Sequence, residues 1–96
     1  MKQDLSKKQK KKRVLIVDDE EDMIWSLQKN LPNEGLKLII FTASSGEEAL
    51  AILEKTKIDL VVTDIRMPGI SGIDLLLAIR NSYPDIGVIV MTAFPS

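Results

Sequence analysis

The sequence contains no cysteine and no histidine, and aromatic residues make up only 4% of it. Without thiols or imidazoles, the chain cannot form a disulfide, a thiolate zinc site or a Ser-His-Asp triad from its own residues. Carboxylate, hydroxyl and lysine chemistry remain. The lack of cysteine is also compatible with the cytoplasmic location that we expect for this protein.

Long apolar runs are also lacking. The apolar run at 14–17 has four residues, whereas the apolar region of a secretory signal peptide has about 7 to 15. No stretch approaches the roughly 20 apolar residues that a membrane-spanning helix requires. We therefore expect neither a signal peptide nor a membrane partner.

Positive and negative charges are distributed unevenly along the chain. Residues 1–13 hold seven Lys or Arg and one acidic residue, and residues 14–96 hold six and thirteen, which gives local net charges of +6 and −7. A basic segment can mark a nucleic-acid or membrane arm, but no aromatic residue lies between these lysines to stack on bases. We predict a solvated basic tail at 1–12 and one domain at 13–96, because a chain this short cannot hold two cores.

Short apolar runs alternate with helical patterns over the rest of the chain. The β-branched run at 14–17 is too short for a helix and predicts a buried strand, and the segment Ser44 to Glu48 offers two overlapping capping boxes. The predicted strands are 14–17, 36–41, 58–63 and 86–91, and the predicted helices are about 20–31, 44–55 and 71–81. This order predicts an α/β fold with a parallel sheet, right-handed crossovers and helices on both faces.

Four polar residues follow or end predicted strands: Asp18, Asp19, Asp64 and Thr92. Each has an ordinary structural explanation in helix capping, turn formation or strand propensity. Ligands of such sheets, however, bind outside the carboxyl ends of the strands, and three carboxylates at close range repel unless a cation or a proton intervenes. Because the ligand atoms would all be oxygens, the pattern points to Mg²⁺.

A combination of motifs makes the sequence recognisable. It comprises Val-Leu-Ile-Val-Asp-Asp-Glu at 14–20, Asp64 followed by Met67, Pro68 and Gly72, and Val-Met-Thr-Ala at 90–93. From about residue 13 to residue 96, the chain resembles the receiver domain of bacterial two-component response regulators. The resemblance implies a three-layer αβα fold of flavodoxin-like type with strand order 2-1-3-4.

The resemblance also implies roles for individual residues. Asp64 would be the phosphoacceptor, which takes a phosphoryl group from a sensor histidine kinase or a small phosphodonor. Asp19, Asp64 and the backbone carbonyl of Arg66 would bind Mg²⁺ directly, Asp18 would act through a water, and Thr92 would be the switch hydroxyl. Such a domain is regulatory and catalyses at most its own phosphorylation and dephosphorylation. Nucleic acid would be contacted only through an output domain.

The sequence departs from the family pattern at its end. A complete receiver has five βα units, and this sequence stops after the fourth predicted strand, so we expect the fourth helix and the fifth βα unit to be missing. The family's lysine at the end of the fifth strand would be missing with them. The strand at 86–91 would then be an uncovered apolar edge, which predicts a homo-oligomer formed through that edge.

Two other functions remain open. One is a signalling-impaired truncated receiver that acts as an oligomerisation or interaction module. The other is a phosphohydrolase of the haloacid dehalogenase type, which would need an acid where this chain has Arg66. In the receiver interpretation, Asp22, Met23 and Ser26 are candidate kinase contacts, and we expect Trp25 to be partly buried under a neighbouring loop.

Overall fold

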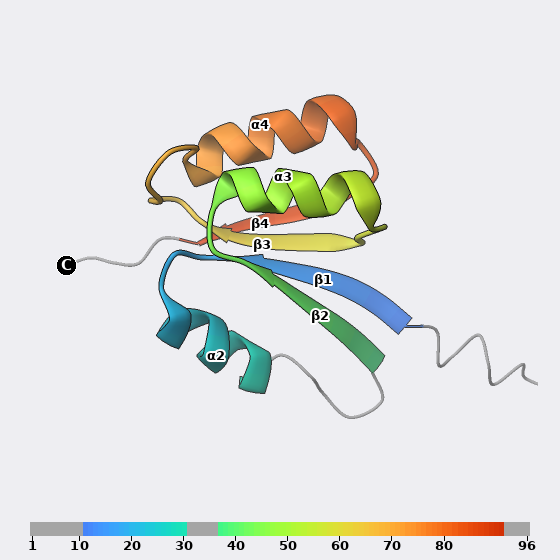
Figure 1. Cartoon of the computed structure of the whole chain (residues 1–96). Coiled ribbons are helices and arrows are strands. Elements are labelled where there is room, and N and C mark those ends of the chain that lie inside the picture. The colour runs from blue at the N-terminus through green and yellow to red at the C-terminus, as the bar shows by residue number, and fades with distance from the viewer. Residues whose placement is uncertain (1–10, 31–36, 92–96) are drawn as a thin grey trace, which may run out of the picture.

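The computed structural model describes residues 11–30 and 37–91 as an alternation of strands and helices (Figure 1). The elements are β1 (Lys11–Val17), α2 (Glu21–Asn30), β2 (Lys37–Ala43), α3 (Gly46–Lys55), β3 (Leu60–Asp64), α4 (Gly72–Ser82) and β4 (Gly87–Met91). The predicted βαβαβαβ order is confirmed. Over the described part of the chain, no helix is long and apolar enough to cross a membrane.

The four strands form one parallel sheet in the order β2-β1-β3-β4. The chain moves outward from β1 to β2 and then crosses back to β3, so the strand order reverses between the two central strands. The carboxyl ends of β1 and β3 are therefore neighbours at the point where such sheets bind ligands. The predicted order is confirmed.

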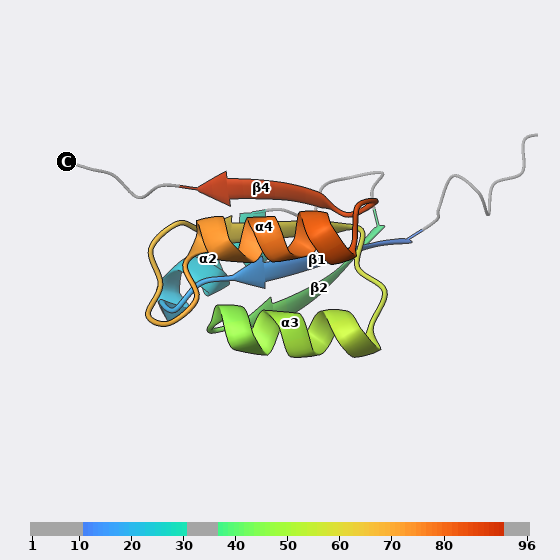
Figure 2. The same ribbon diagram turned by 90° about the horizontal axis from the view of Figure 1, so that it is seen from above.

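Helices cover both faces of the sheet, with α3 and α4 on one face and α2 on the other (Figures 1 and 2). Leu15 and Val17 belong to the core cluster that includes buried residues of α3 and α4, whereas Val14 and Ile16 belong to the cluster on the α2 side. All four are therefore buried, which explains why this strand is apolar at consecutive positions. The predicted three-layer fold is confirmed.

The segment Ser44 to Glu48 offered two overlapping capping boxes, and the structure has one N-cap there, at the start of α3. Ser45 is the N-cap, and its hydroxyl accepts a hydrogen bond from the backbone N–H of Glu48 at 3.0 Å. The Glu48 carboxylate accepts in return from the backbone N–H and the hydroxyl of Ser44. These bonds lower the pKa of Glu48, and they fix the turn between β2 and α3.

The first strand begins earlier than the apolar pattern predicts. β1 starts at Lys11 rather than at residue 14, because Lys11, Lys12 and Arg13 pair in register with residues 37–39 of β2. Their side chains are exposed, so hydropathy gives no signal of this extension. The division at residue 12 stays a prediction. Residues 32–35, between the helix predicted at about 20–31 and the strand predicted at 36–41, lie outside the described residues.

Trp25 is 62% exposed on α2, and the Lys29 ammonium lies 4.8 Å from the centre of its ring. The prediction of partial burial under a loop was wrong. The helical stripe of Ile24 and Leu27 turns toward the sheet, which directs Trp25 away from it.

Candidate functional site

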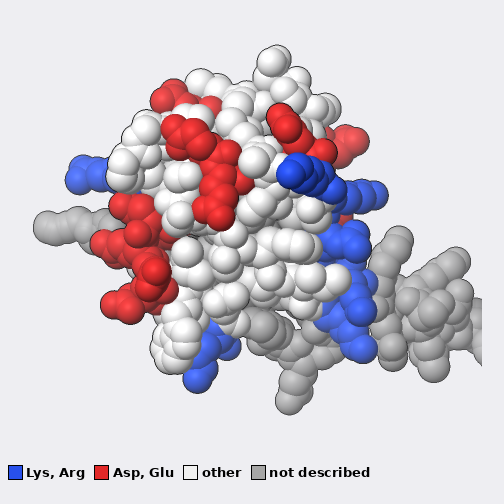
Figure 3. Space-filling view, viewed as in Figure 1, with Lys and Arg blue, Asp and Glu red and all other residues white. Residues whose placement is uncertain are grey.

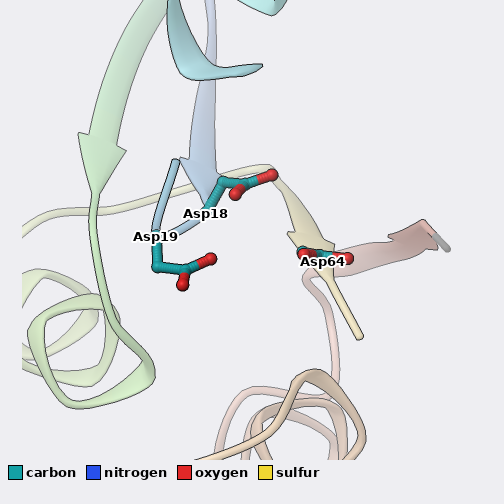
Figure 4. Close-up of side chains that lie close together, drawn as sticks. All are labelled: Asp18, Asp19 and Asp64. Carbon is teal, nitrogen blue, oxygen red and sulfur yellow. The ribbon is translucent and has the colours of Figure 1, made fainter. Parts of the chain in front are cut away.

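Three carboxylates converge at the carboxyl ends of the two central strands. Asp18 and Asp19 directly follow β1, and Asp64 is the last residue of β3. One oxygen from each side chain lies within 4.8 Å of the others (Figure 4). The structure thus brings together the three acids that the sequence singled out, whereas Thr92 lies outside the described residues.

The three acids differ in burial. Asp18 is 3% exposed, Asp64 is half-buried and Asp19 is exposed. Burial is the largest cause that raises the pKa of the Asp18 carboxyl, and the nearby charges of Asp64 and Asp19 raise it further. The backbone N–H of Glu20, which donates to Asp18 Oδ1 at 2.9 Å, opposes this rise.

This bond between Asp18 and Glu20 is an Asx turn, which the sequence interpretation missed. The side chain of the first residue accepts from the backbone two positions later and so fixes the chain between β1 and α2. An aspartate at a strand end ahead of a helix is the signal that could have revealed it.

The backbone around Asp64 is held on two sides. The N–H of Ile65 donates to the carbonyl of Met91 at 2.9 Å, which extends the pairing of β3 with β4. The N–H of Gly72 donates to the Ile65 carbonyl at 2.8 Å, and this bond ties the start of α4 to the residue that follows Asp64. The Asp64 carboxyl is therefore presented from a fixed backbone.

Gly72 explains why the motif contains glycine eight residues after Asp64. A Cβ at this position would overlap the carbonyl oxygen of Asp64 and lie 2.8 Å from Cα of Ile65. Both atoms belong to the backbone, so neither can move aside as a side chain would. The turn before α4 also needs glycine at Gly69, which has a φ of 77°.

Arg66 lies in the loop after β3, and its side chain is exposed. It lines an open hollow together with Asp19 and the Met67-Pro68 turn. The role of its backbone carbonyl as a metal ligand stays a prediction. The three carboxylates alone form an all-oxygen donor set of the kind that takes one Mg²⁺ and leaves room for waters and a phosphate oxygen.

Residues 14–96 match the family model of the response regulator receiver domain. The chain belongs to this family. Receiver domains act in two-component signalling as regulatory modules rather than as classical enzymes.

Two curated relatives show the extent of the likeness. The receiver chain is 40% identical over 82 residues to the alkaline phosphatase synthesis transcriptional regulatory protein PhoP of Bacillus subtilis, a match that covers 85% of this chain and 33% of the relative. It is 40% identical over 80 residues to the DNA-binding transcriptional regulator NtrC of Salmonella typhimurium, covering 83% of this chain and 17% of the relative. The receiver chain thus spans a third or less of these two relatives.

Solved structures show the same fold. The response regulator TrrA from Thermotoga maritima, in complex with Mg²⁺-BeF, superposes with a TM-score of 0.77 at 42% identity, over 86% of this chain and 70% of that chain. The signal receiver domain of an HD domain-containing protein from Pseudomonas fluorescens Pf-5 gives 0.78 at 29% identity, over 91% and 68%. The predicted flavodoxin-like receiver fold is confirmed.

Proposed function

We propose that this receiver domain accepts a phosphoryl group on Asp64 from a sensor histidine kinase, with Mg²⁺ bound at the carboxylate cluster. The convergence of one oxygen from each of Asp18, Asp19 and Asp64 within 4.8 Å, at the ends of adjacent strands, carries the proposal. Asp64 is the member of the cluster that also precedes the Met67-Pro68 turn of the family motif.

The transfer needs little from the protein beyond position and charge. A carboxylate oxygen of Asp64 forms a bond to phosphorus as the bond from phosphorus to the kinase imidazole nitrogen breaks, and that nitrogen keeps the electron pair. The product is an acyl phosphate on Asp64. The hydrogen bonds at Ile65 and Gly72 hold the attacking residue in place, which lowers the entropic part of the barrier.

The donor atoms of the site suit a magnesium ion. Asp19, Asp64 and the Arg66 carbonyl would hold it directly and Asp18 through a water, while the Thr92 hydroxyl would turn toward the phosphoryl group. Bound Mg²⁺ would balance the negative charge of the three carboxylates and of the phosphoryl oxygens. The similar receiver TrrA was solved in complex with Mg²⁺-BeF, which supports Mg²⁺ as the proposed ion.

The first prediction tests Asp64 directly. After incubation with acetyl phosphate and Mg²⁺, the parent chain should gain about 80 Da in its intact mass, the increment of one phosphoryl group. Asp64→Asn should abolish this gain because an amide cannot form the acyl phosphate. Asp85→Asn, at an exposed position before β4, is the matched control and should label like the parent. Equal labelling of Asp64→Asn and the parent would refute the proposal.

A second candidate function is supported by the edge of the sheet. Among the described residues, β4 pairs with β3 alone, and its sequence Gly-Val-Ile-Val-Met has neither a charge nor a proline to protect an edge. Ile89 is 51% exposed on this strand. We infer that this receiver forms a homo-oligomer through the β4 edge, and light scattering of the full chain across micromolar concentrations tests this inference.

A further inference from the structure

A group of exposed cations lies at the end of the sheet opposite the carboxylates. Lys11, Lys12 and Arg13 form the first part of β1, and Lys37 begins β2. All four side chains are exposed. In Figure 3, Lys and Arg gather over the amino ends of these two strands, while Asp and Glu gather at the carboxyl end of the sheet.

The strand register places three of these cations on one face. Leu15 on β1 and Phe41 on β2 belong to the core cluster on the α3 and α4 side, and side chains alternate between faces along a strand. Lys11, Arg13 and Lys37 therefore share that side, and we call these three residues the basic end.

The three residues of the basic end are close neighbours in the sheet. Lys11 is the direct register partner of Lys37, and paired strands lie about 4.7 to 4.9 Å apart. Arg13 follows Lys11 by two residues, a spacing of about 6.6 to 6.8 Å. Like charges placed directly opposite each other on neighbouring strands are destabilising.

Among the described residues, 11–30 and 37–91, no acidic side chain neutralises this charge through an ion pair. The acid that contacts the segment is Asp59, and its Oδ2 accepts the backbone N–H of Arg13 at 2.8 Å rather than the guanidinium. The charge is therefore available to an anionic partner.

We propose that the basic end binds the phosphate backbone of a nucleic-acid duplex without sequence preference. Neutralising phosphates with Lys and Arg is sufficient for such binding. A membrane fits less well, because stable attachment of a polybasic surface needs a second, apolar anchor. The large exposed apolar residues of the described chain are Trp25, Ile73, Leu77 and Ile89, and none of them lies on β1 or β2.

The sequence predicted nucleic-acid contact only through an output domain. The new observation is the placement of Lys37 beside Lys11, from which it is separated by 26 positions (37 − 11). The carboxylate cluster lies at the far end of the strands, so its negative charge does not oppose a duplex at the basic end.

The test measures how salt weakens the binding of the full chain to a labelled DNA duplex of about 20 base pairs. Fluorescence anisotropy of the duplex is the readout. Each phosphate contact contributes about 0.9 to the slope of log affinity against log salt. Affinity falls as NaCl rises from about 50 to 200 mM. In the triple variant Lys11→Gln, Arg13→Gln, Lys37→Gln, this fall should be about 40-fold smaller than in the parent. Lys29→Gln, which removes a cation from α2, is the control and should keep the parent slope.

Four results would overturn the proposal. These are no duplex binding by the parent at the lower salt concentration, an unchanged slope in the triple variant, binding to phosphatidylserine vesicles but not to the duplex, and charge-dependent self-association in place of DNA binding. Far-UV circular dichroism checks folding, and Lys37→Gln alone should reduce the slope by about 0.9 if the triple variant is unfolded. Acetyl phosphate labelling of Asp64 should be the same in all these variants, so this test and that of the phosphoacceptor fail independently.

Discussion

Asp18 is the residue whose surroundings conflict most with its charge. It is buried, and its carboxylate lies beside those of Asp19 and Asp64. The ionised side chain therefore lowers the stability of the metal-free protein, as the raised pKa of its carboxyl indicates. A site that binds a cation tolerates such repulsion because the ion relieves it.

We predict that Asp18→Asn stabilises the metal-free protein at neutral pH. The amide removes one of three like charges, and its oxygen can still accept the hydrogen bond from Glu20. The gain should be on the order of 1 kcal/mol in the free energy of unfolding, measured by urea denaturation. Asp85→Asn should change stability by less than about 0.5 kcal/mol. A variant less stable than the parent without metal would contradict this account.

The same substitution should weaken the response to magnesium. Mg²⁺ that binds only the folded parent would raise its stability in proportion to the logarithm of the metal concentration, and Asp18→Asn lacks one of the charges that attract the ion. The stability advantage of the variant should therefore shrink or reverse as Mg²⁺ is added.

Single residues also show how much of the site could be predicted from the sequence. The meeting of Asp18, Asp19 and Asp64 was predictable, because the carboxyl ends of parallel strands share one edge of the sheet. Their unequal burial was not predictable, because it depends on how the neighbouring loops pack. The exposure of Trp25 was missed for a similar reason, since its position beside the apolar stripe of α2 leaves two possible orientations.

At the scale of elements, the junction between β3 and α4 depends on backbone contact. A side chain at Gly72 would collide with main-chain atoms of Asp64 and Ile65. The first turn of α4 therefore packs directly against the strand that carries the proposed phosphoacceptor, and a change at this contact would disturb both the helix and the site.

We predict that Gly72→Ala destabilises the protein by about 1 to 3 kcal/mol, the usual range of mutations that overpack a tight contact. Urea denaturation followed by circular dichroism measures the loss. Gly87→Ala is the control, because its Cβ would meet the flexible end of Leu60 at 3.3 Å rather than a backbone atom. Equal stability of the two variants would show that the contact at Gly72 relaxes without cost.

The existence and order of the strands and helices were largely predictable from the sequence. The residues at which they begin and end were less predictable. The apolar runs and the Ser45 cap identified the strands and the start of α3 because these features reflect burial and capping. The start of β1 escaped detection because pairing between backbones continues through exposed lysines, which hydropathy does not register. Such an extension becomes visible only when the partner strand is in place.

At the scale of the whole molecule, β4 is an edge strand of the sheet that the described residues form. Ile89 is exposed there, whereas Val88 packs against the core. A lysine at Ile89 should therefore act on association with little effect on folding.

We predict that Ile89→Lys converts the homo-oligomer into a monomer, because a charge on the edge strand opposes pairing with a second copy. Light scattering across micromolar concentrations measures the change. Trp25→Lys replaces an exposed residue on α2, beside the opposite edge strand β2, and should leave the oligomeric state unchanged. A parent that is monomeric throughout this range would disprove association through β4.

The exposure of Trp25 has a practical consequence, because it is the one tryptophan of the chain. An indole already in contact with solvent emits at long wavelength in the native state, and its emission changes little when the core melts. Fluorescence of this residue therefore reports on partners that approach α2, and on the Lys29 ammonium above the ring. It does not report on the packing of the helices against the sheet. The emission of Trp25 would therefore stay nearly constant even when the protein unfolds completely.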